Sequence, residues 1–191
     1  MNDSELIAGI ISGDESKFKV LVDSYRSLVV NTCFGFLQNK EIAHDIAQEV
    51  FIEVFLSIKK FKGESQISTW LYRIAVNKSL NHIRNNKKRE IFKRIENFFS
   101  FSDTYNKEYS ETEQDNDNSD DPEKQLEAVH KCINSLPENQ RIAYTLSNID
   151  KISYKEIAEI TGQSLASVEG LVHRAKKNIR KKIFDFYKKN S

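Results

Sequence analysis

Residues that break helices are scarce in this chain of 191 amino acids, which has only six glycines and two prolines. With 30% charged and 39% hydrophobic residues, the composition is typical of soluble helices rather than of a turn-rich β protein. The two cysteines, Cys33 and Cys132, are far apart in sequence and form no CxxC pair, so they predict neither a disulfide framework nor a zinc site. The four histidines show no HxxxH or HExxH spacing, and no metal site is predicted.

Long apolar runs are also missing. No stretch approaches the roughly 18 apolar residues of a membrane span. The amino terminus has no basic segment followed by an apolar one, so no signal peptide is expected, and we predict a cytoplasmic protein without direct membrane insertion. The chain also has no nucleophile constellation and no glycine-rich phosphate loop. These absences predict that it is not an enzyme and has no catalytic residues, no cofactor and no small-molecule substrate.

Charge is unevenly distributed, although the formal net charge is only +1. Residues 103–121 are almost wholly acidic and polar, with Lys107 as the one opposing charge, whereas residues 173–182 read HRAKKNIRKK. A second basic stretch lies before the acidic segment, at residues 78–94. This partition predicts nucleic-acid contacts at two places with a solvated tether between them.

Apolar spacing predicts a helical domain over residues 1–95. Its first helix is expected to stop at Gly13, and Asp14 is expected to cap the next helix. Residues 41–60 show the clearest period, with an apolar residue at every fourth position. The predicted buried stripe of this helix consists of Ile42, Ile46, Ala47, Val50, Phe51, Val54, Phe55 and Ile58.

The other side of this helix carries an acidic ridge. Asp45, Glu49 and Glu53 follow one another at i,i+4 spacing, with Gln48 alongside. Like charges at this spacing cost a few tenths of a kcal/mol per pair in an isolated helix. No Lys or Arg within the ridge relieves this cost, so the pattern favours either a basic partner from elsewhere or a solvated acidic face.

A polar loop that carries an aromatic residue runs from Phe61 into a helix with a basic end. Unpaired bases stack on aromatic faces while Lys and Arg follow the phosphate backbone, so the stretch suits a wall for melted nucleic acid. Trp70, Leu71, Ile74 and Ala75 have helical spacing and are assigned to the core rather than to base stacking. The candidate functional groups of this stretch are therefore the loop at residues 61–68 and the cations at the basic end of the helix.

Residues 96–121 are expected to form a flexible acidic linker, because apolar periodicity is lost there apart from the FFSF cluster at residues 98–101. Asp121 as the cap and Pro122 at the first position predict the start of a second helical domain over residues 122–191. The buried side of its first helix is predicted to carry Leu126, Val129 and Ile133.

A helix-turn-helix is predicted near the carboxyl end. Ser153 and Glu156 form a capping box before a short helix, Gly162 permits a sharp turn, and Ser164 can cap a longer final helix. A plain αα-hairpin would explain the apolar spacing, but not the cations after the turn. These cations are Arg174, Lys176, Lys177, Arg180, Lys181 and Lys182.

Residues near the amino end of such a helix meet base edges in the major groove. Arg174 could bind guanine or grip phosphate, and Glu169 could accept from a cytosine amino group or have no contact. Gly170 costs roughly 1 kcal/mol against Ala inside a helix. We expect its backbone to lie close to another element. The outward-facing candidates are Ser164, Ser167, Glu169, Gly170, His173 and Arg174.

Three separated segments together resemble the bacterial sigma-70-type sigma factors, specifically the extracytoplasmic-function (ECF) group. DIAQEVFIEVF at residues 45–55 resembles the polymerase-clamp helix of the second conserved region. FKGESQISTWLYRIAVN at residues 61–77 resembles its promoter-melting part, and NKSLNHIRNNKKRE resembles the continuation. Residues 136–181 resemble the fourth region. The resemblance implies an all-α protein of two small helical domains that binds core RNA polymerase and promoter DNA and directs initiation.

The resemblance also implies roles for individual residues. Asp45, Gln48 and Glu49 match positions that contact polymerase, and Phe61, Lys62 and Asn77 fall in the part that captures the minus-ten element. An anti-sigma factor is an expected partner, and the acidic linker is placed near the active centre, where its acidity serves either as a nucleic-acid mimic or for solubility. The remaining DNA-binding residues are Arg84, Lys87, Lys88 and Arg89 near the minus-ten element and Ser164, Ser167, His173, Arg174 and Lys177 at the minus-thirty-five element.

Two alternatives remain open on the sequence. A stand-alone helix-turn-helix regulator would bind DNA without polymerase and would not need the ridge at Asp45 and Glu49. A sigma-mimicking protein that only sequesters an anti-sigma factor could dispense with the cations at Lys87, Lys88 and Arg89, which this chain retains.

Overall fold

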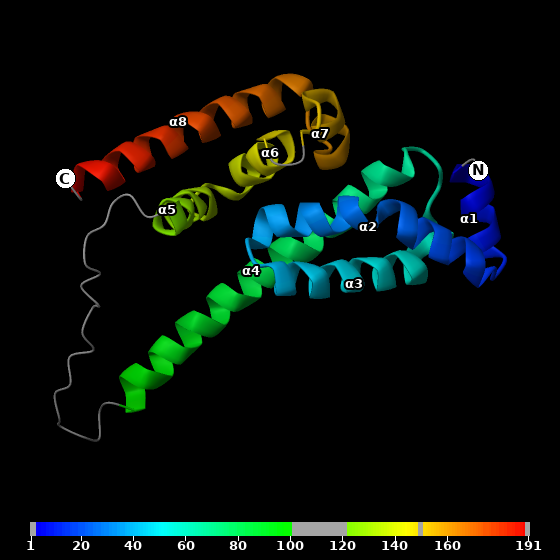
Figure 1. Ribbon diagram of the computed structural model, residues 1–191, viewed down its shortest axis with the longest axis horizontal. Helices are drawn as coiled ribbons and strands as arrows, with labels where there is room; N and C mark the ends of the chain where they lie inside the picture. Colours follow the sequence, from blue (N-terminus) through cyan, green and yellow to red (C-terminus); the bar gives the residue numbers. More distant parts are fainter. Residues whose placement is uncertain (1–2, 101–121, 149–150, 190–191) are drawn as a thin grey trace.

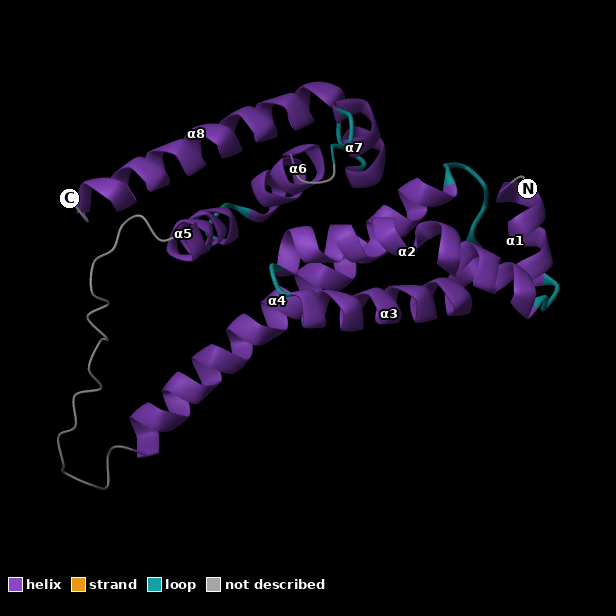
Figure 2. Ribbon diagram, in the orientation of Figure 1, coloured by secondary structure: helices purple, strands orange, loops and turns teal. Residues whose placement is uncertain are grey.

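The computed structural model describes residues 3–100, 122–148 and 151–189. Within these ranges the regular structure is entirely helical, as Figure 2 shows. The all-α class predicted from the scarcity of glycine and proline is therefore confirmed. None of the helices in these ranges is long and apolar enough to cross a bilayer.

The amino-terminal domain is a bundle of three helices with a fourth across one end (Figure 1). The three helices α2 (Glu15–Leu37), α3 (Lys40–Ser57) and α4 (Ile67–Ser100) pack against one another, and α1 (Asp3–Ile11) packs on α2. A single 3-10 turn, η1 (Ile58–Lys60), follows α3. The fully buried residues Leu21, Val29, Val50, Val54 and Leu71 form the centre of its core.

Polar side chains set the helix starts in this domain. The Asp14 carboxylate accepts from the Ser16 amide, as the cap prediction required. Asn39 caps α3 by accepting from the Ile42 amide at 3.0 Å, and Gln38 ends α2 with a positive φ of 57°. Each cap satisfies a terminal backbone group that has no partner inside its helix.

The buried stripe predicted for residues 41–60 is largely correct. Ile46, Val50 and Ile58 are buried, but the prediction for Phe55 is wrong, because 52% of this residue is exposed. Phe55 lies where α1 and α2 meet the end of α3, and its ring makes an edge contact with Phe18 at a centroid distance of 5.1 Å. The spacing placed Phe55 at the margin of the stripe, and the small α1 does not cover it.

Helix α4 is longer than expected. It continues to Ser100, past the predicted domain boundary at residue 95 and into the predicted linker, and its carboxyl half projects from the bundle (Figure 1). A helix of 34 residues is about 50 Å long. The rest of the predicted linker, and its predicted flexibility, lie at residues 101–121, outside the described ranges.

The carboxyl-terminal domain contains α5 (Pro122–Asn134), α6 (Glu138–Asn148), α7 (Tyr154–Thr161) and α8 (Leu165–Lys189). Helix α5 starts at Pro122 as predicted, and the proposed Asp121 cap lies outside the described residues. Leu126 is 56% exposed, so its assignment to the buried side was wrong, whereas Ile133 is buried.

The helix-turn-helix is confirmed. The Ser153 hydroxyl accepts from the Glu156 amide at 3.3 Å, and the Glu156 carboxylate accepts from the Ser153 amide at 3.1 Å. Gly162 ends α7 with a φ of +68°, a conformation that favours glycine. Ser164 accepts from the Ser167 amide at 3.2 Å and so caps α8.

The two domains share an apolar core. Phe36 of α2 and Val76 and Leu80 of α4 belong to one buried cluster together with residues of α6, α7 and α8. The cluster members from the second domain are Ala143, Leu146, Ile157, Ile160, Val168 and Val172. The domains therefore lie side by side, with α6 and α7 against α2 and α4 (Figure 1).

Candidate polymerase and nucleic-acid surfaces

The acidic ridge lies on the solvent side of α3. Asp45, Gln48 and Glu49 are all exposed. Two large apolar residues, Ile52 and Leu56, fall on the same face by helical spacing and are 59% and 70% exposed. Sequence reasoning missed them because they stand outside the buried period. The ridge and these apolar side chains together form a composite stripe that suits a partner helix with basic and apolar residues.

The ridge has a basic neighbour within the chain. Lys78 of α4 places its Nζ 3.6 Å from a Glu53 carboxylate oxygen and 4.0 Å from one of Glu49. These pairs are partly exposed, so each contributes at most about 1 kcal/mol. Lys78 therefore relieves part of the like-charge cost, and it leaves Asp45 as a carboxylate on the outer side of the ridge.

Phe61 is held in place by the turn before it and the helix after it. Its amide donates to the Ile58 carbonyl at 3.0 Å, and its backbone is extended. The ring packs against Trp70 of α4 with centroids 5.1 Å apart and planes tilted by 45°. Gly63 then turns the chain with a φ of +72°. The half-buried Phe61 ring thus packs on Trp70, with its backbone joined to the end of η1.

One face of α4 carries both aromatic and polar residues. Trp70, Arg73, Asn77, Arg84 and Lys88 fall close together on the helix wheel, at steps of three, four or seven residues. Asn77 is exposed one turn beyond Arg73. Trp70, which packs against Phe61, therefore lies on the same side of α4 as Asn77. Trp70 and Arg73 extend this surface, and sequence reasoning did not assign them to it.

The predicted backbone-binding cations on α4 lie in or next to its projecting half. Lys87, Lys88 and Arg89 are exposed there, and Lys62 is exposed in the loop. Arg84 is different, because its guanidinium pairs with the Glu138 carboxylate of α6 and its Nε–Oε2 distance is 3.1 Å. Successive residues are about 100° apart around a helix, so Arg89 faces a different direction from Lys88.

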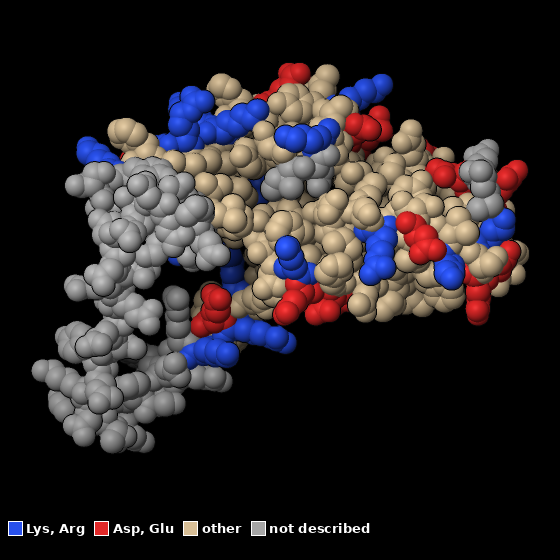
Figure 3. All heavy atoms as spheres, viewed as in Figure 1, with Lys and Arg blue, Asp and Glu red and all other residues tan. Residues whose placement is uncertain are grey.

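Helix α8 presents its cations to solvent. His173, Arg174 and Lys177 are exposed, and Ser164 is exposed at the cap. Ser167 is half-buried and donates its hydroxyl to the Gln163 side chain at 2.8 Å. Figure 3 shows basic side chains gathered over α8 and over the projecting part of α4. The two basic regions predicted from the sequence are therefore separate surfaces.

Gly170 does not serve the purpose that the sequence suggested. The three atoms nearest to a Cβ at this position all belong to the guanidinium of Arg174 in the same helix, the nearest at 3.1 Å. The expectation of a close backbone approach was therefore wrong. The small residue leaves room for Arg174 to lie along the exposed face of α8.

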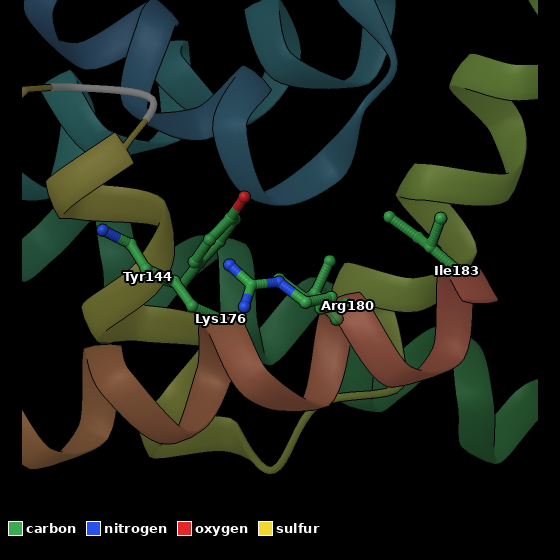
Figure 4. A pocket seen from close by; sticks show the side chains of 5 residues that line it. Tyr144, Lys176, Arg180 and Ile183 are labelled. Carbon is green, nitrogen blue, oxygen red and sulfur yellow. The ribbon is translucent and has the colours of Figure 1, made fainter.

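A shallow pocket of about 320 Å³ lies between α6 and α8 (Figure 4). Tyr144, Lys176 and Arg180 line it with two isoleucines, and burial raises the pKa of the Tyr144 hydroxyl. Lys176 and Arg180 therefore extend the basic surface of α8 toward the side that faces Tyr144 of α6. Across the described residues, no group of three His, Cys, Asp or Glu side chains could hold a metal ion.

Comparison with known proteins matches both domains to regions of one family. The family described as sigma-70 region 2 matches residues 21–89, and the family described as sigma-70, region 4 matches residues 126–179. The ECF RNA polymerase sigma-E factor of Escherichia coli K12 is 32% identical over 188 residues, which cover 96% of this chain and 95% of that protein. The chain belongs to the ECF group of sigma-70-type sigma factors.

Two further relatives give the same result. The ECF sigma factor SigW of Bacillus subtilis is 32% identical over 94% of this chain and 95% of its own length. The ECF sigma-E factor of Haemophilus influenzae is 31% identical over 96% of each chain. This sigma factor is accordingly a promoter-specificity subunit that binds core RNA polymerase and directs transcription initiation.

Solved structures support the fold of this sigma factor. The structure of CnrH in complex with the cytosolic domain of CnrY matches with a TM-score of 0.63 and 21% identity, over 99% of both chains. The sigma factor RpoE from Bartonella quintana, in complex with the anti-sigma factor NepR, matches with a TM-score of 0.53 over 87% of this chain and 96% of that one. All the residues predicted to bind polymerase or DNA lie within the two matched sigma-70 regions.

Proposed function

We propose that α3 carries the polymerase-binding surface and that α4 and α8 carry the two promoter-binding surfaces. The observation that supports this division most strongly is the face of α4, where the Phe61–Trp70 pair, Asn77 and a row of cations follow one another. Stacking and hydrogen-bonding groups next to cations match the chemistry of an unpaired strand. The proposal divides the chain into a first domain at residues 1–95, a linker at 96–121 and a second domain at 122–191.

On α3, Asp45, Gln48 and Glu49 contact a basic element of core polymerase, and Ile52 and Leu56 add apolar contacts. A patch that combines charge with large exposed apolar side chains is a stronger docking surface than a solvated acidic face. Lys78 must share Glu49 with the incoming partner. The partly exposed ion pair is weak enough for this exchange.

In the loop and on α4, Phe61 and Asn77 hold a base extruded from the minus-ten element. Extrusion of a base costs a few kcal/mol, which the pocket must offset. Lys62, Arg84, Lys87, Lys88 and Arg89 hold the backbone beside it. Because these contacts are to phosphate, they position the DNA without reading its sequence.

At the carboxyl end, α8 enters the major groove of the minus-thirty-five element. Arg174 and His173 face the bases, and Lys177 holds phosphate. Ser164 and Ser167 lie at the amino end of the helix, where base contacts are made. The Ser167 hydroxyl donates to the Gln163 side chain, so these two side chains contact the DNA together.

An anti-sigma factor is the partner proposed for regulation. The solved sigma factor RpoE of similar fold is bound to the anti-sigma factor NepR, which supports the proposal. We place the protein in the cytoplasm, where its polymerase and DNA partners are. It acts as a binding subunit without catalytic residues or a cofactor of its own.

Run-off transcription tests the proposed function. Core polymerase with this protein should give discrete transcripts from fragments of the genome that encodes it, and core polymerase alone should not. The mapped start sites should share two upstream elements, one for each DNA-binding surface. Specific DNA binding by the isolated protein, without any polymerase-dependent transcript, would instead identify a stand-alone regulator.

A further inference from the structure

A pocket of about 450 Å³ lies where α1 and the start of α2 meet the end of α3 and η1. Figure 1 shows these elements together at one end of the amino-terminal bundle. The apolar walls of the pocket come from three helices, with Ile11 on α1, Phe18 on α2, and Phe55 and Leu56 on α3. Ile11 is 41% exposed and Leu56 is 70% exposed, so part of this apolar lining is open to solvent. The surfaces proposed for polymerase and DNA do not include α1.

The pocket is formed before any partner binds, because α1 is fixed on the bundle. The Asp14 amide donates to the Gly9 carbonyl and the Gly13 amide donates to the Ile10 carbonyl, each at 3.0 Å. Leu6 and Ile10 anchor α1 in the buried core of the domain. A preformed site loses little conformational entropy when a partner docks.

The acidic ridge on α3 leads directly to this pocket. Successive residues are about 100° apart around a helix, so Asp45, Ile52 and Leu56 fall within about 40° of one another on α3. Leu56 is the last member of this stripe and is also a wall of the pocket. Phe55 stands next to it and makes the edge contact with Phe18 across the pocket. A partner that lies along the ridge therefore reaches the pocket without leaving α3.

The charges of the pocket have the same sign as the ridge. Asp14 and Glu15 line it, against one cation, Lys59. The Asp14 carboxylate accepts from the hydroxyl and the amide of Ser16, and these hydrogen bonds lower the pKa of Asp14. Asp14 is therefore ionised at neutral pH. A partner with basic residues next to apolar ones fits the pocket as it fits the ridge.

We propose that the pocket receives a large apolar side chain of core polymerase, from the same basic element that lies on the ridge. The docking surface then extends from Asp45 through Leu56 to α1, and Ile11 is a polymerase contact. A pocket of this volume suits one or two anchor side chains, which contribute much of the binding energy in protein interfaces. The inference rests on the proposed function, because it takes α3 to be the polymerase surface.

Photo-crosslinking identifies what enters the pocket. p-Benzoylphenylalanine replaces Ile11 in one sample and Gln48 of the ridge in another, and each whole chain is bound to core polymerase before illumination. Mass spectrometry then identifies the crosslinked peptides. Position 11 should crosslink to the same polymerase element as position 48. A crosslink to a second copy of this chain, to a distant part of polymerase, or to no protein would overturn the proposal.

Ile11→Ala measures how much the pocket contributes to affinity. Val20→Ala is the matched control, because Val20 is an aliphatic residue of the neighbouring α2 with 40% exposure against 41% for Ile11. Val20 lies about 200° around α2 from Phe18 and so faces away from the pocket. Biolayer interferometry on immobilised core polymerase should show about five- to ten-fold weaker binding for Ile11→Ala, since apolar surface is lost from the interface. Val20→Ala should change the Kd by less than about two-fold, and equal Kd values for the two variants would overturn the proposal.

Two further variants separate direct contact from damage to α1. Ile11→Leu keeps the apolar volume and should bind like wild type, whereas Ile11→Gln replaces the apolar surface with a polar group and should bind as weakly as Ile11→Ala. Thermal unfolding is measured for every variant. If affinity instead follows the melting temperature across the series, Ile11 only holds α1 in place and the proposal is wrong.

Glu49→Lys in the same binding assay distinguishes this proposal from the proposed function. If Glu49→Lys loses binding while the Ile11 variants keep it, the pocket proposal is wrong and the ridge assignment stands. If the Ile11 variants lose binding while Glu49→Lys keeps it, polymerase uses the pocket and the ridge assignment is wrong. If all of them bind like wild type, both are wrong.

Discussion

Replacement of Phe61 by Ala tests whether its ring captures a base or only fills space beside Trp70. The structure predicts a moderate loss of stability. The tilted ring pair at 5.1 Å contributes about 0.5–1.5 kcal/mol beyond area burial, and half-burial of a Phe side chain adds roughly 1 kcal/mol. A total of about 2 kcal/mol is small beside the 5–15 kcal/mol that is typical of a folded protein. Phe61→Ala should therefore fold and bind core polymerase.

The functional loss should be larger than this loss of stability implies. A base stacked on an aromatic side chain loses about 1–3 kcal/mol when that side chain becomes Ala, which lowers the population of open complexes roughly five- to 150-fold. Permanganate footprinting of the bubble, on a promoter mapped by run-off transcription, measures this population directly. Pulldown of core polymerase measures binding separately.

Phe18→Ala provides a matched control. Phe18 also belongs to an aromatic pair with a centroid distance of 5.1 Å in the same domain, but it lies on α2 and its partner is Phe55 of α3. It should lower the melting temperature by a similar amount and leave the footprint intact. A footprint that is unchanged in Phe61→Ala, or equally weakened in Phe18→Ala, would refute the pocket.

Three other changes give sharp expectations. Glu49→Lys reverses the charge at the centre of the ridge and should abolish pulldown of core polymerase. The control Asp23→Lys makes the same change on α2 and should leave pulldown intact. Retention of pulldown by Glu49→Lys would contradict the ridge assignment. Gly162→Ala meets no atoms within 4 Å but must adopt a φ of +68°, so thermal unfolding should show a loss of about 1 kcal/mol from backbone strain alone. The hydrogen bond from the Ser153 hydroxyl lowers the pKa of the Glu156 carboxyl from its ordinary value. The stabilisation by this carboxylate is therefore full above the pKa of the unfolded state and is lost as the pH falls through the pKa of the folded state. Urea unfolding below about pH 4 should therefore show less acid sensitivity in Glu156→Gln, which keeps a neutral capping box, and equal sensitivity would show that this carboxylate is not responsible.

Local patterns in the sequence were sufficient for most of the helices and for the helix-turn-helix. The capping box at Ser153 and Glu156 and the glycine at 162 depend on neighbours within four residues, so their chemistry can be read directly from the order of residues. The ridge on α3 follows from the helical period in the same way. The candidate polymerase and DNA residues were chosen from these patterns and from family resemblance, and their roles are still predictions.

Margins of helices were harder to predict. Phe55 and Leu126 have the spacing of buried residues but are exposed, because no neighbouring element within residues 3–100, 122–148 and 151–189 covers them. Helix α4 continues to Ser100 because it contains no glycine or proline that would end it, although apolar periodicity is lost earlier. A period shows which face a residue occupies, but not how far the packing partner reaches.

By itself, the sequence determined the helical class, the two basic regions, the caps and the acidic ridge, since these depend on residues close together in the chain. Only the tertiary structure decided how the ridge and the arginines of α4 are paired. Lys78 relieves Glu49 and Glu53, and Arg84 binds a carboxylate 54 residues away. Such pairs are set by the packing of the two domains on a shared apolar core, and helical spacing holds no information about partners so distant in sequence.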